Sequence, residues 1–415
     1  VPMPDGSYQR FRIIESPVFH PSLGAKFPEI RTFIAHGLDD PLAGGRLDWT
    51  PKGFHAQIFT SGRVVYVDPH LRGDTSIYVS YHRRDRVRGP GTFTCLLPGS
   101  RRAAERAAAG GRGGSGGAGP VTGDVLRTYK IAVACTGEYA QFHGGTVVDA
   151  MAAIATTINR VVGIYEREFS VRMEIVANND SLIFLDGTTD PYSNSDGAAM
   201  LSQNQTTVDG VIGSANYDIG HVFSTAGGGI AGLGVVCRLL SKARGVTGSA
   251  APVGDSFNVD FVAHEIGHQF NCDHTFNGDS GSCTSANRNG PTAYEPGSGS
   301  TIMAYAGICG NDDLQLLSEP YFHSASHDQI AAYITTGVGG NCDTATATGN
   351  NPPTVDAGPD FTIPAATPLR LTAVGSDPDA GDVLTYNWEQ RDLGPQNDVN
   401  AGDNGASPLF RSWTP

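Results

Sequence analysis

A regular stripe of apolar residues near the middle of the chain predicts a long amphipathic helix. Six apolar side chains recur at spacings of three and four residues, namely Val147, Met151, Ile154, Ile158, Val161 and Tyr165. This spacing places them on one helix face, which must be buried against another layer. Strands are predicted around it at 128–134, 171–176, 218–224 and 233–237, with a second helix at 198–212. Strands that alternate with helices indicate a sheet covered by helices.

The first hundred residues show a different pattern. Short segments with alternating or β-branched apolar residues occur at 8–14, 30–36, 63–68 and 76–81. Because turn-forming residues separate these segments, residues 1–100 are predicted to be a β-rich region.

Composition changes abruptly after this region. Residues 100–120 consist mainly of glycine and alanine with four arginines and have no apolar period. Such a segment cannot bury a core, so residues 101–123 are predicted to be a flexible linker with sites for activating cleavage. The central domain is assigned to residues 124–345.

A second linker at 346–352 precedes another β-rich pattern. Apolar and polar residues alternate at 369–373 and 383–388, between turn-forming residues. This pattern is typical of a β-sandwich, but a complete sandwich has about 100 residues. Residues 353–415 are therefore predicted to be a partial one.

The totals exclude some classes of partner and favour an oxidising compartment. A formal net charge of −14 argues against nucleic acid or an anionic membrane as partner. No run of about eighteen apolar residues occurs, so no transmembrane segment is predicted. Seven cysteines allow three disulfides and one free thiol, which favours a secreted protein. The alternative is a set of reduced, buried cysteines in a cytosolic enzyme.

The residues that carry chemistry lie in the sequence VAHEIGHQFNCDH. On a helix, His264 and His268 project from one face and can hold one metal ion. His274 supplies a third nitrogen if the chain reverses, and Asn271 tolerates the positive φ that a reversal requires. Three protein ligands plus one water define a catalytic zinc site. Glu265 is then placed to take the proton of that water as it attacks a carbonyl group.

The sequence HEIGHQFNCDH resembles the metzincin motif HExxHxxGxxH, with Asn271 in place of the usual glycine. Metzincins also have a methionine turn below the metal, which the sequence STIMAY with Met303 resembles. Tyr305 matches a tyrosine that some metzincins place near zinc, where it binds the metal or stabilises the transition state. The alternative for Tyr305 is a structural role in the turn. The resemblance implies a zinc endopeptidase with a mixed five-stranded sheet and long helices, acting on proteins or peptides.

Within the metzincins, the order of elements before the motif is similar to that of reprolysins. The resemblance implies that one segment lines the cleft and pairs with the substrate backbone. That segment is Ile230, Ala231, Gly232, Leu233 and Gly234. The alternative is a glycine-rich loop without a substrate role. Two departures from the family pattern are Thr275, where animal members carry aspartate, and Cys272 inside the motif.

The same resemblance implies a pairing of the cysteines. It suggests the disulfides Cys237–Cys342 and Cys283–Cys309, which leaves Cys135 with Cys272 and Cys95 unpaired. Because fifteen pairings of six cysteines exist, this set is one hypothesis.

The region before the linker resembles a prodomain, and Cys95 lies near its end. A thiolate at that position could occupy the fourth coordination position of zinc and keep the enzyme latent. The alternative is a small buried core residue.

The C-terminal region resembles a polycystic-kidney-disease type sandwich. Asp377, Asp379 and Asp382 could bind Ca²⁺ there, although a metal-free acidic turn is the alternative.

Two other functions also fit the zinc-binding motif. One is an adhesion protein with a structural zinc site, and the other is a zinc hydrolase acting on something other than peptides. Glu265 favours catalysis, because structural sites usually close with a fourth protein ligand. The sequence does not give the cleavage preference or the oligomeric state.

Overall fold

The computed structural model describes residues 1–86, 120–284, 286–364 and 366–414. Within these residues, the N-terminal region is one antiparallel six-stranded sheet in the order β1-β2-β3-β4-β5-β6. Its elements are β1 (Phe11–Glu15), α1 (Pro21–Gly24), β2 (Arg31–Gly37), β3 (Gly44–Thr50), β4 (Gly53–Thr60), β5 (Arg63–Pro69), β6 (Tyr78–His82) and η1 (Arg83–Asp85).

Strands β1, β2, β5 and β6 overlap the four strands predicted for this region, whereas β3 and β4 were not predicted. The apolar–polar alternation of β3 and β4 does not show in the sequence, because some of their inward-facing residues are polar. Arg46 and Asp48 on β3 are buried, and both contact the long helix of the next domain.

The central domain contains a mixed sheet of six strands rather than the predicted five. The order is β10-β11-β9-β7-β12, with β8 also paired to β7. Strands β7, β8, β9 and β11 run parallel to one another, while β10 is antiparallel to β11 and β12 is antiparallel to β7. The strands are β7 (Val125–Cys135), β8 (Val171–Ile175), β9 (Ile219–Ser224), β10 (Gly229–Ala231), β11 (Gly245–Gly248) and β12 (Thr344–Ala347).

The strand predicted at 233–237 is wrong, because this stretch forms turns. The edge strand β10 lies a few residues earlier, and β11 was not predicted. The backbone of the turn is used elsewhere: the N–H of Gly234 donates to the carbonyl of His268 at 2.9 Å, and that of Val235 to Gln269 at 2.9 Å.

Helices cover this sheet. They are α3 (Gly137–His143), α4 (Val147–Phe169), η2 (Asn179–Leu182), α5 (Gly197–Val211), α6 (Asp255–Phe257), the π-helical turn η3 (Asn258–Ala263), α7 (His264–Gln269), η4 (Gly281–Cys283), η5 (Gly290–Thr292), η6 (Gly310–Asp312), α8 (Ser324–Thr335) and η7 (Val338–Asn341).

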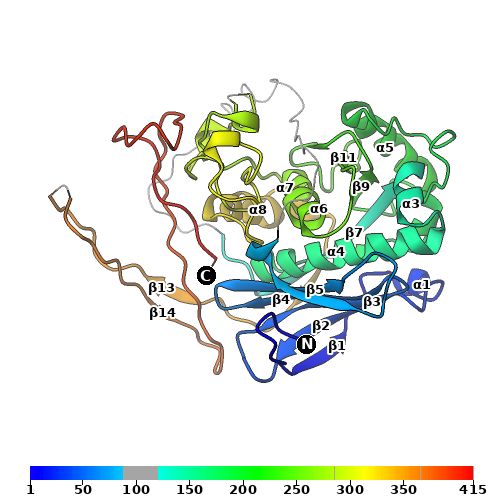
Figure 1. The fold of residues 1–415 in the computed structure, drawn as a ribbon, viewed down its shortest axis with the longest axis horizontal. Helices are drawn as coiled ribbons and strands as arrows, with labels where there is room; N and C mark the ends of the chain where they lie inside the picture. The colour runs from blue at the N-terminus through cyan, green and yellow to red at the C-terminus, as the bar shows by residue number, and fades with distance from the viewer. Residues whose placement is uncertain (87–119, 285, 365, 415) are drawn as a thin grey trace.

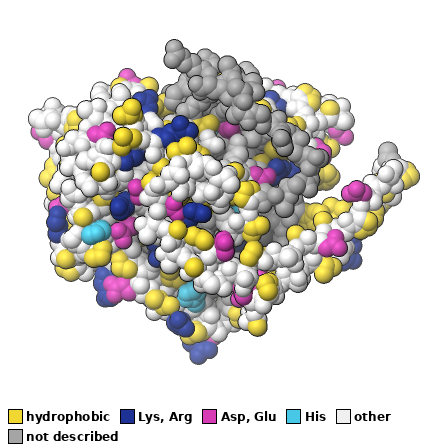
Figure 2. Space-filling view, turned by 180° about the vertical axis from the view of Figure 1, so that it is seen from behind, with side chains coloured by type: hydrophobic (Ala, Val, Ile, Leu, Met, Phe, Trp, Pro, Cys, Tyr) yellow, Lys and Arg dark blue, Asp and Glu magenta, His cyan; other side chains and the backbone are white. Residues whose placement is uncertain are grey.

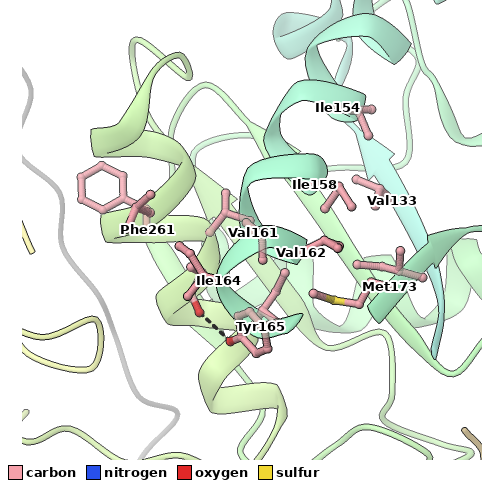
Figure 3. Packing of buried hydrophobic residues seen from close by; sticks show 14 of the residues in the cluster. Val133, Ile154, Ile158, Val161, Val162, Ile164, Tyr165, Met173 and Phe261 are labelled. Atoms are coloured by element: carbon pink, nitrogen blue, oxygen red, sulfur yellow. Dashed lines mark hydrogen bonds between the residues drawn. The ribbon is translucent and has the colours of Figure 1, made fainter. Parts of the chain in front are cut away.

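Helix α4 is the predicted amphipathic helix, and it lies between the N-terminal sheet and the layer that contains α7 (Figure 1). Figure 3 shows Ile154 and Ile158 near Val133 of β7, with Val161 and Tyr165 toward the chain around Phe261. Among the described residues, α4 is the one helix whose length and composition would suit a membrane, but 72% of its most apolar window is buried inside the molecule. Its apolar surface is therefore explained by the protein core.

The described part of residues 353–415 contains one two-stranded pairing and no second sheet layer. Strands β13 (Thr354–Asp356) and β14 (Val374–Ser376) pair antiparallel on an arm that projects from the body, where Figure 2 shows exposed hydrophobic side chains. Later residues lie on the central domain: Asn277 donates to Pro395 O at 2.9 Å, and Ser300 to Ser412 O at 2.9 Å. The described residues of this region thus do not form the two layers of the predicted β-sandwich. The apolar side chains of β13 and β14 have no facing sheet within the described part of the chain.

Candidate metal centre

The first two histidines lie on the short helix α7, which continues directly from η3. The hydroxyl of Tyr165 on α4 donates to Ala263 O at 2.8 Å, where η3 meets α7 (Figure 3). The helix ends at Gln269, and Asn271, two residues later, has a φ of 76°. The N–H of Asn271 donates to His268 O at 2.8 Å, and that of Cys272 to Gly267 O at 2.9 Å. This left-handed helix end turns the chain back, as the sequence predicts, and brings His274 toward the other two histidines.

A backbone carbonyl fixes the orientation of each of the three imidazoles. The Nδ1–H groups of His264, His268 and His274 donate to the carbonyl oxygens of Ile302 at 2.7 Å, Cys272 at 2.7 Å and Asn287 at 2.6 Å. Since each Nδ1 carries the proton, each Nε2 presents a lone pair. This arrangement is the one that holds metal-binding histidines in a single tautomer and orientation.

The three Nε2 atoms converge on one point. The Nε2 of His274 lies 3.2 Å from that of His264 and 3.1 Å from that of His268. A tetrahedral zinc ion with Zn–N bonds of about 2.0–2.1 Å separates its nitrogen ligands by about 3.3 Å. The three nitrogens therefore have the spacing that zinc requires, and these residues fit the metal.

The electrostatic setting also suits a cation. Burial lowers the pKa of His264 to about 4, so its ring is neutral at pH 7 and available as a ligand. Glu265, the neighbouring residue on α7, has no exposed surface. The centre thus combines three nitrogen ligands with one adjacent carboxylate in a buried position.

The predicted methionine turn lies against the zinc helix. A Cβ atom on Gly267 of α7 would stand 2.5 Å from the sulfur of Met303, so glycine permits this close approach. The N–H of Thr275, which follows the third histidine, donates to Met303 O at 3.2 Å. Met303 is fully buried. The turn consequently supports both the helix and the segment that carries the third ligand.

Sequence reasoning missed Glu295, a buried acid that joins these two segments. One of its oxygens accepts from the Thr275 hydroxyl at 2.6 Å, and the other accepts from the N–H of Ser300 at 2.7 Å and of Thr301 at 3.1 Å. Its carboxylate thereby holds the start of the methionine turn next to His274. The pattern around Glu295 has no distinctive spacing, so the sequence offers no local signal of this role.

Tyr305 lies beside the third ligand. Its ring centroid is 4.5 Å from that of His274 and 5.7 Å from that of His264, and it stacks on Phe276 at 4.5 Å. The structure therefore places this residue next to the metal centre, as the resemblance implies.

The segment from Ile230 to Gly234, predicted to bind the substrate backbone, begins on the edge strand β10 and contacts α7. Two of its N–H groups make internal hydrogen bonds, from Gly232 to Arg244 O at 2.8 Å and from Gly234 to His268 O at 2.9 Å. Substrate pairing along this segment stays a prediction.

Two disulfides occur in the described part of the chain. They join Cys237 to Cys342 and Cys283 to Cys309, the two pairs that the resemblance implies. The third expected pair is wrong, because Cys135 and Cys272 are both free buried thiols. Cys135 ends β7, whereas the Cys272 thiol faces Ser326 O at 3.9 Å, next to α8. Cys95 lies outside the described residues.

Two acidic clusters are also present among the described residues. The first is the predicted calcium site, Asp377, Asp379 and Asp382, and the second is Asp279, Asp312 and Asp398. In the second cluster, Asp312 accepts backbone N–H bonds from Asp279 at 2.7 Å and Ser280 at 3.0 Å. These bonds account for the position of Asp312 without a metal. Calcium binding stays a prediction.

A buried centre of three histidines, two of them on a helix that also carries the adjacent glutamate and packs against a mixed sheet, defines a zinc-dependent peptidase. Residues 125–333, just over half of the chain, match the family described as metallo-peptidase family M12B, reprolysin-like. The chain belongs to this family. It is therefore a zinc metalloendopeptidase, a hydrolase that acts on proteins.

No curated protein matches the chain. Among solved structures, metalloproteinase-II from Bacteroides fragilis is similar at 12% identity, with a TM-score of 0.30. The match covers 63% of this chain and 77% of that chain. A likeness this distant carries no argument about the site.

Proposed function

We propose that this protein is a secreted endopeptidase in which Glu265 is the general base. The observation that carries the proposal is the convergence of three Nε2 atoms whose Nδ1–H groups are all bound to backbone carbonyls. A purely structural zinc site would need a fourth protein ligand and no adjacent carboxylate. Glu265 supplies a base where a water molecule would meet the peptide carbonyl.

The residues divide the work of peptide hydrolysis. His264, His268 and His274 would hold zinc, which when bound would supply the Lewis acidity that acidifies water and polarises the carbonyl of the scissile bond. Glu265 accepts a proton from the attacking water and donates it to the leaving nitrogen. Tyr305, whose ring lies beside that of His274, donates a hydrogen bond to the oxygen that becomes negative in this proposal.

The enzyme is made as a latent zymogen in this proposal. The arginine-rich linker at 101–123 supplies the activation sites, and Cys95 holds the fourth coordination position until the linker is cut. Two disulfides support an oxidising, extracellular location.

The test compares Glu265→Ala with the unchanged enzyme after cleavage of the linker. We expect casein hydrolysis to fall by about 10²- to 10⁴-fold, because the base is lost while the three ligands remain. Zinc content should stay at one ion per chain, and a chelator should abolish the activity of the unchanged enzyme. Zinc binding without any cleavage of casein by the unchanged, processed enzyme contradicts the proposal and favours a structural site.

A further inference from the structure

The N-terminal region and the central domain share one hydrophobic core. A single buried cluster contains residues from the N-terminal sheet and its flanking segments together with most of the apolar face of α4. The N-terminal members are Val18, Phe19, Leu23, Phe27, Ile30, Phe59, Val64 and Tyr66. Burying such side chains contributes about 1.5–3 kcal/mol each. The contact is therefore comparable to the interior of one domain.

The N-terminal region also covers an edge of the central sheet. The N–H of Ile175 on β8 donates to Val18 O at 2.7 Å, and the N–H of His20 donates to Ile175 O at 2.9 Å. Phe19 thereby pairs in parallel with Ile175. Removing the N-terminal region would expose this part of β8 and its unpaired backbone groups.

Three ion pairs with buried arginines cross the same interface. Arg46 pairs with Glu166 of α4, and Asp68 pairs with Arg160 of α4 at 2.5 Å. The third pair joins Arg83 of η1 to Asp260 of η3, where the side chains are 5% and 3% exposed. Each pair matches charges across the interface, so removing one partner while the two regions stay together leaves the other charge buried and unpaired, which is strongly destabilising.

The third pair lies on the segment that leads into the zinc helix. Asp260 is on η3, which continues into α7 with its two histidine ligands. Arg83 also donates to the carbonyl oxygen of Ser318, in the segment that follows the methionine turn. One N-terminal side chain therefore ties together the two segments that flank the zinc site.

We propose that the N-terminal region is a permanent partner of the central domain, which remains bound without a covalent link after the linker is cut. Activation then frees the linker but not the sheet β1–β6. Through Arg83, the retained region positions the helix that carries the zinc ligands. The positioning role rests on the proposed function, whereas retention does not.

Retention is tested on the full chain in the Glu265→Ala background, which prevents self-digestion. A recognition sequence for a specific protease is inserted between Gly113 and Gly114, and the cut protein is run on size-exclusion chromatography in native buffer. We expect both fragments to co-elute in a 1:1 ratio and to separate only in denaturant. Separate elution of two folded fragments in native buffer overturns the proposal.

The contribution of the buried pair is tested with Arg83→Met and a matched control, Arg10→Met. Arg10 makes an exposed ion pair with Asp39 inside the N-terminal region, where its side chain is 78% exposed. We expect Arg83→Met to weaken fragment association by at least about tenfold and Arg10→Met to leave it unchanged. Equal effects of the two substitutions contradict the role of Arg83. Near-ultraviolet circular dichroism of the uncut chains checks folding, and Arg83→Lys, with an intermediate effect expected, replaces Arg83→Met if that variant does not fold.

The positioning role has its own measurement, the rate at which a colorimetric chelator removes zinc from the cut protein. Arg83→Met should release zinc faster, while Arg10→Met should match the unchanged protein. Equal release rates overturn positioning. If the unchanged protein holds no zinc, the proposed function fails, and the co-elution result still decides retention.

Discussion

At the scale of single residues, the reversal at Asn271 is the feature on which the third zinc ligand depends. Its φ of 76° lies in the left-handed region, which Asn and Gly adopt more readily than other residues. The local sequence predicts this conformation because the spacing of the histidines requires a turn there. His264, His268 and His274 could therefore be predicted from sequence, since the geometry that unites them is local.

We expect Asn271→Ala to lower the free energy of unfolding by about 1–2 kcal/mol and to weaken zinc binding, because alanine disfavours the left-handed region. Asn271→Gly should be close to neutral in both respects. Ser170, with φ of 54° at the end of α4, is a matched control. Ser170→Ala should lower stability without affecting zinc, as measured by urea unfolding and zinc titration. An equal loss of zinc affinity in both alanine variants would contradict this explanation.

Glu168 provides a pH-dependent contribution to stability. Burial raises its pKa to about 7. The folded chain therefore retains a proton that the unfolded chain loses near pH 4.5. Its stabilising contribution is complete below that pH and is lost as the pH rises through about 7.

Glu168→Gln removes this titration. We expect it to raise the free energy of unfolding by about 2 kcal/mol at pH 8 and to have little effect at pH 4.5. Urea denaturation at the two pH values measures the difference. A gain of the same size at both values would mean that the carboxyl group does not titrate as described.

At the scale of elements, the zinc helix and the methionine turn pack closely because the helix has a glycine at the contact. Gly267 allows the sulfur of Met303 to approach α7, and Glu295 fixes the other side of the turn. The sequence motif predicts the glycine-containing helix and the methionine. It does not predict Glu295, because that residue acts through contacts with Thr275 and Ser300 rather than through a periodic position.

Gly267→Ala should force Met303 out of its position. We expect a loss of about 1–3 kcal/mol in stability, as in other overpacked cores, together with weaker zinc binding. Gly210→Ala on α5 is the control, because a Cβ atom there would meet nothing within 4 Å. The control should be neutral or stabilising by up to about 1 kcal/mol. Unchanged zinc affinity in Gly267→Ala would show that Met303 does not support the site.

At the scale of the whole molecule, the predictions that failed are those that depend on distant contacts. Strand β3 was missed because Arg46 and Asp48 face inward to meet α4, more than a hundred residues later. The pairing of Cys135 with Cys272 was what remained after the two other pairs, and nothing in the sequence indicates whether the two thiols approach each other in the fold. Helix α4 was predicted correctly, because its apolar period is a local property.

The two free thiols among the described residues can serve as an internal reporter of unfolding. Cys135 and Cys272 have no exposed surface, and burial raises the pKa of both thiols well above the usual range. Neither can react with an alkylating reagent until the chain around it opens, because the thiolate is the reactive form. We expect pulse labelling in native buffer to leave both residues unmodified and labelling in urea to modify them together, as read by peptide mass spectrometry. Modification of one before the other would locate the first part of the core to open.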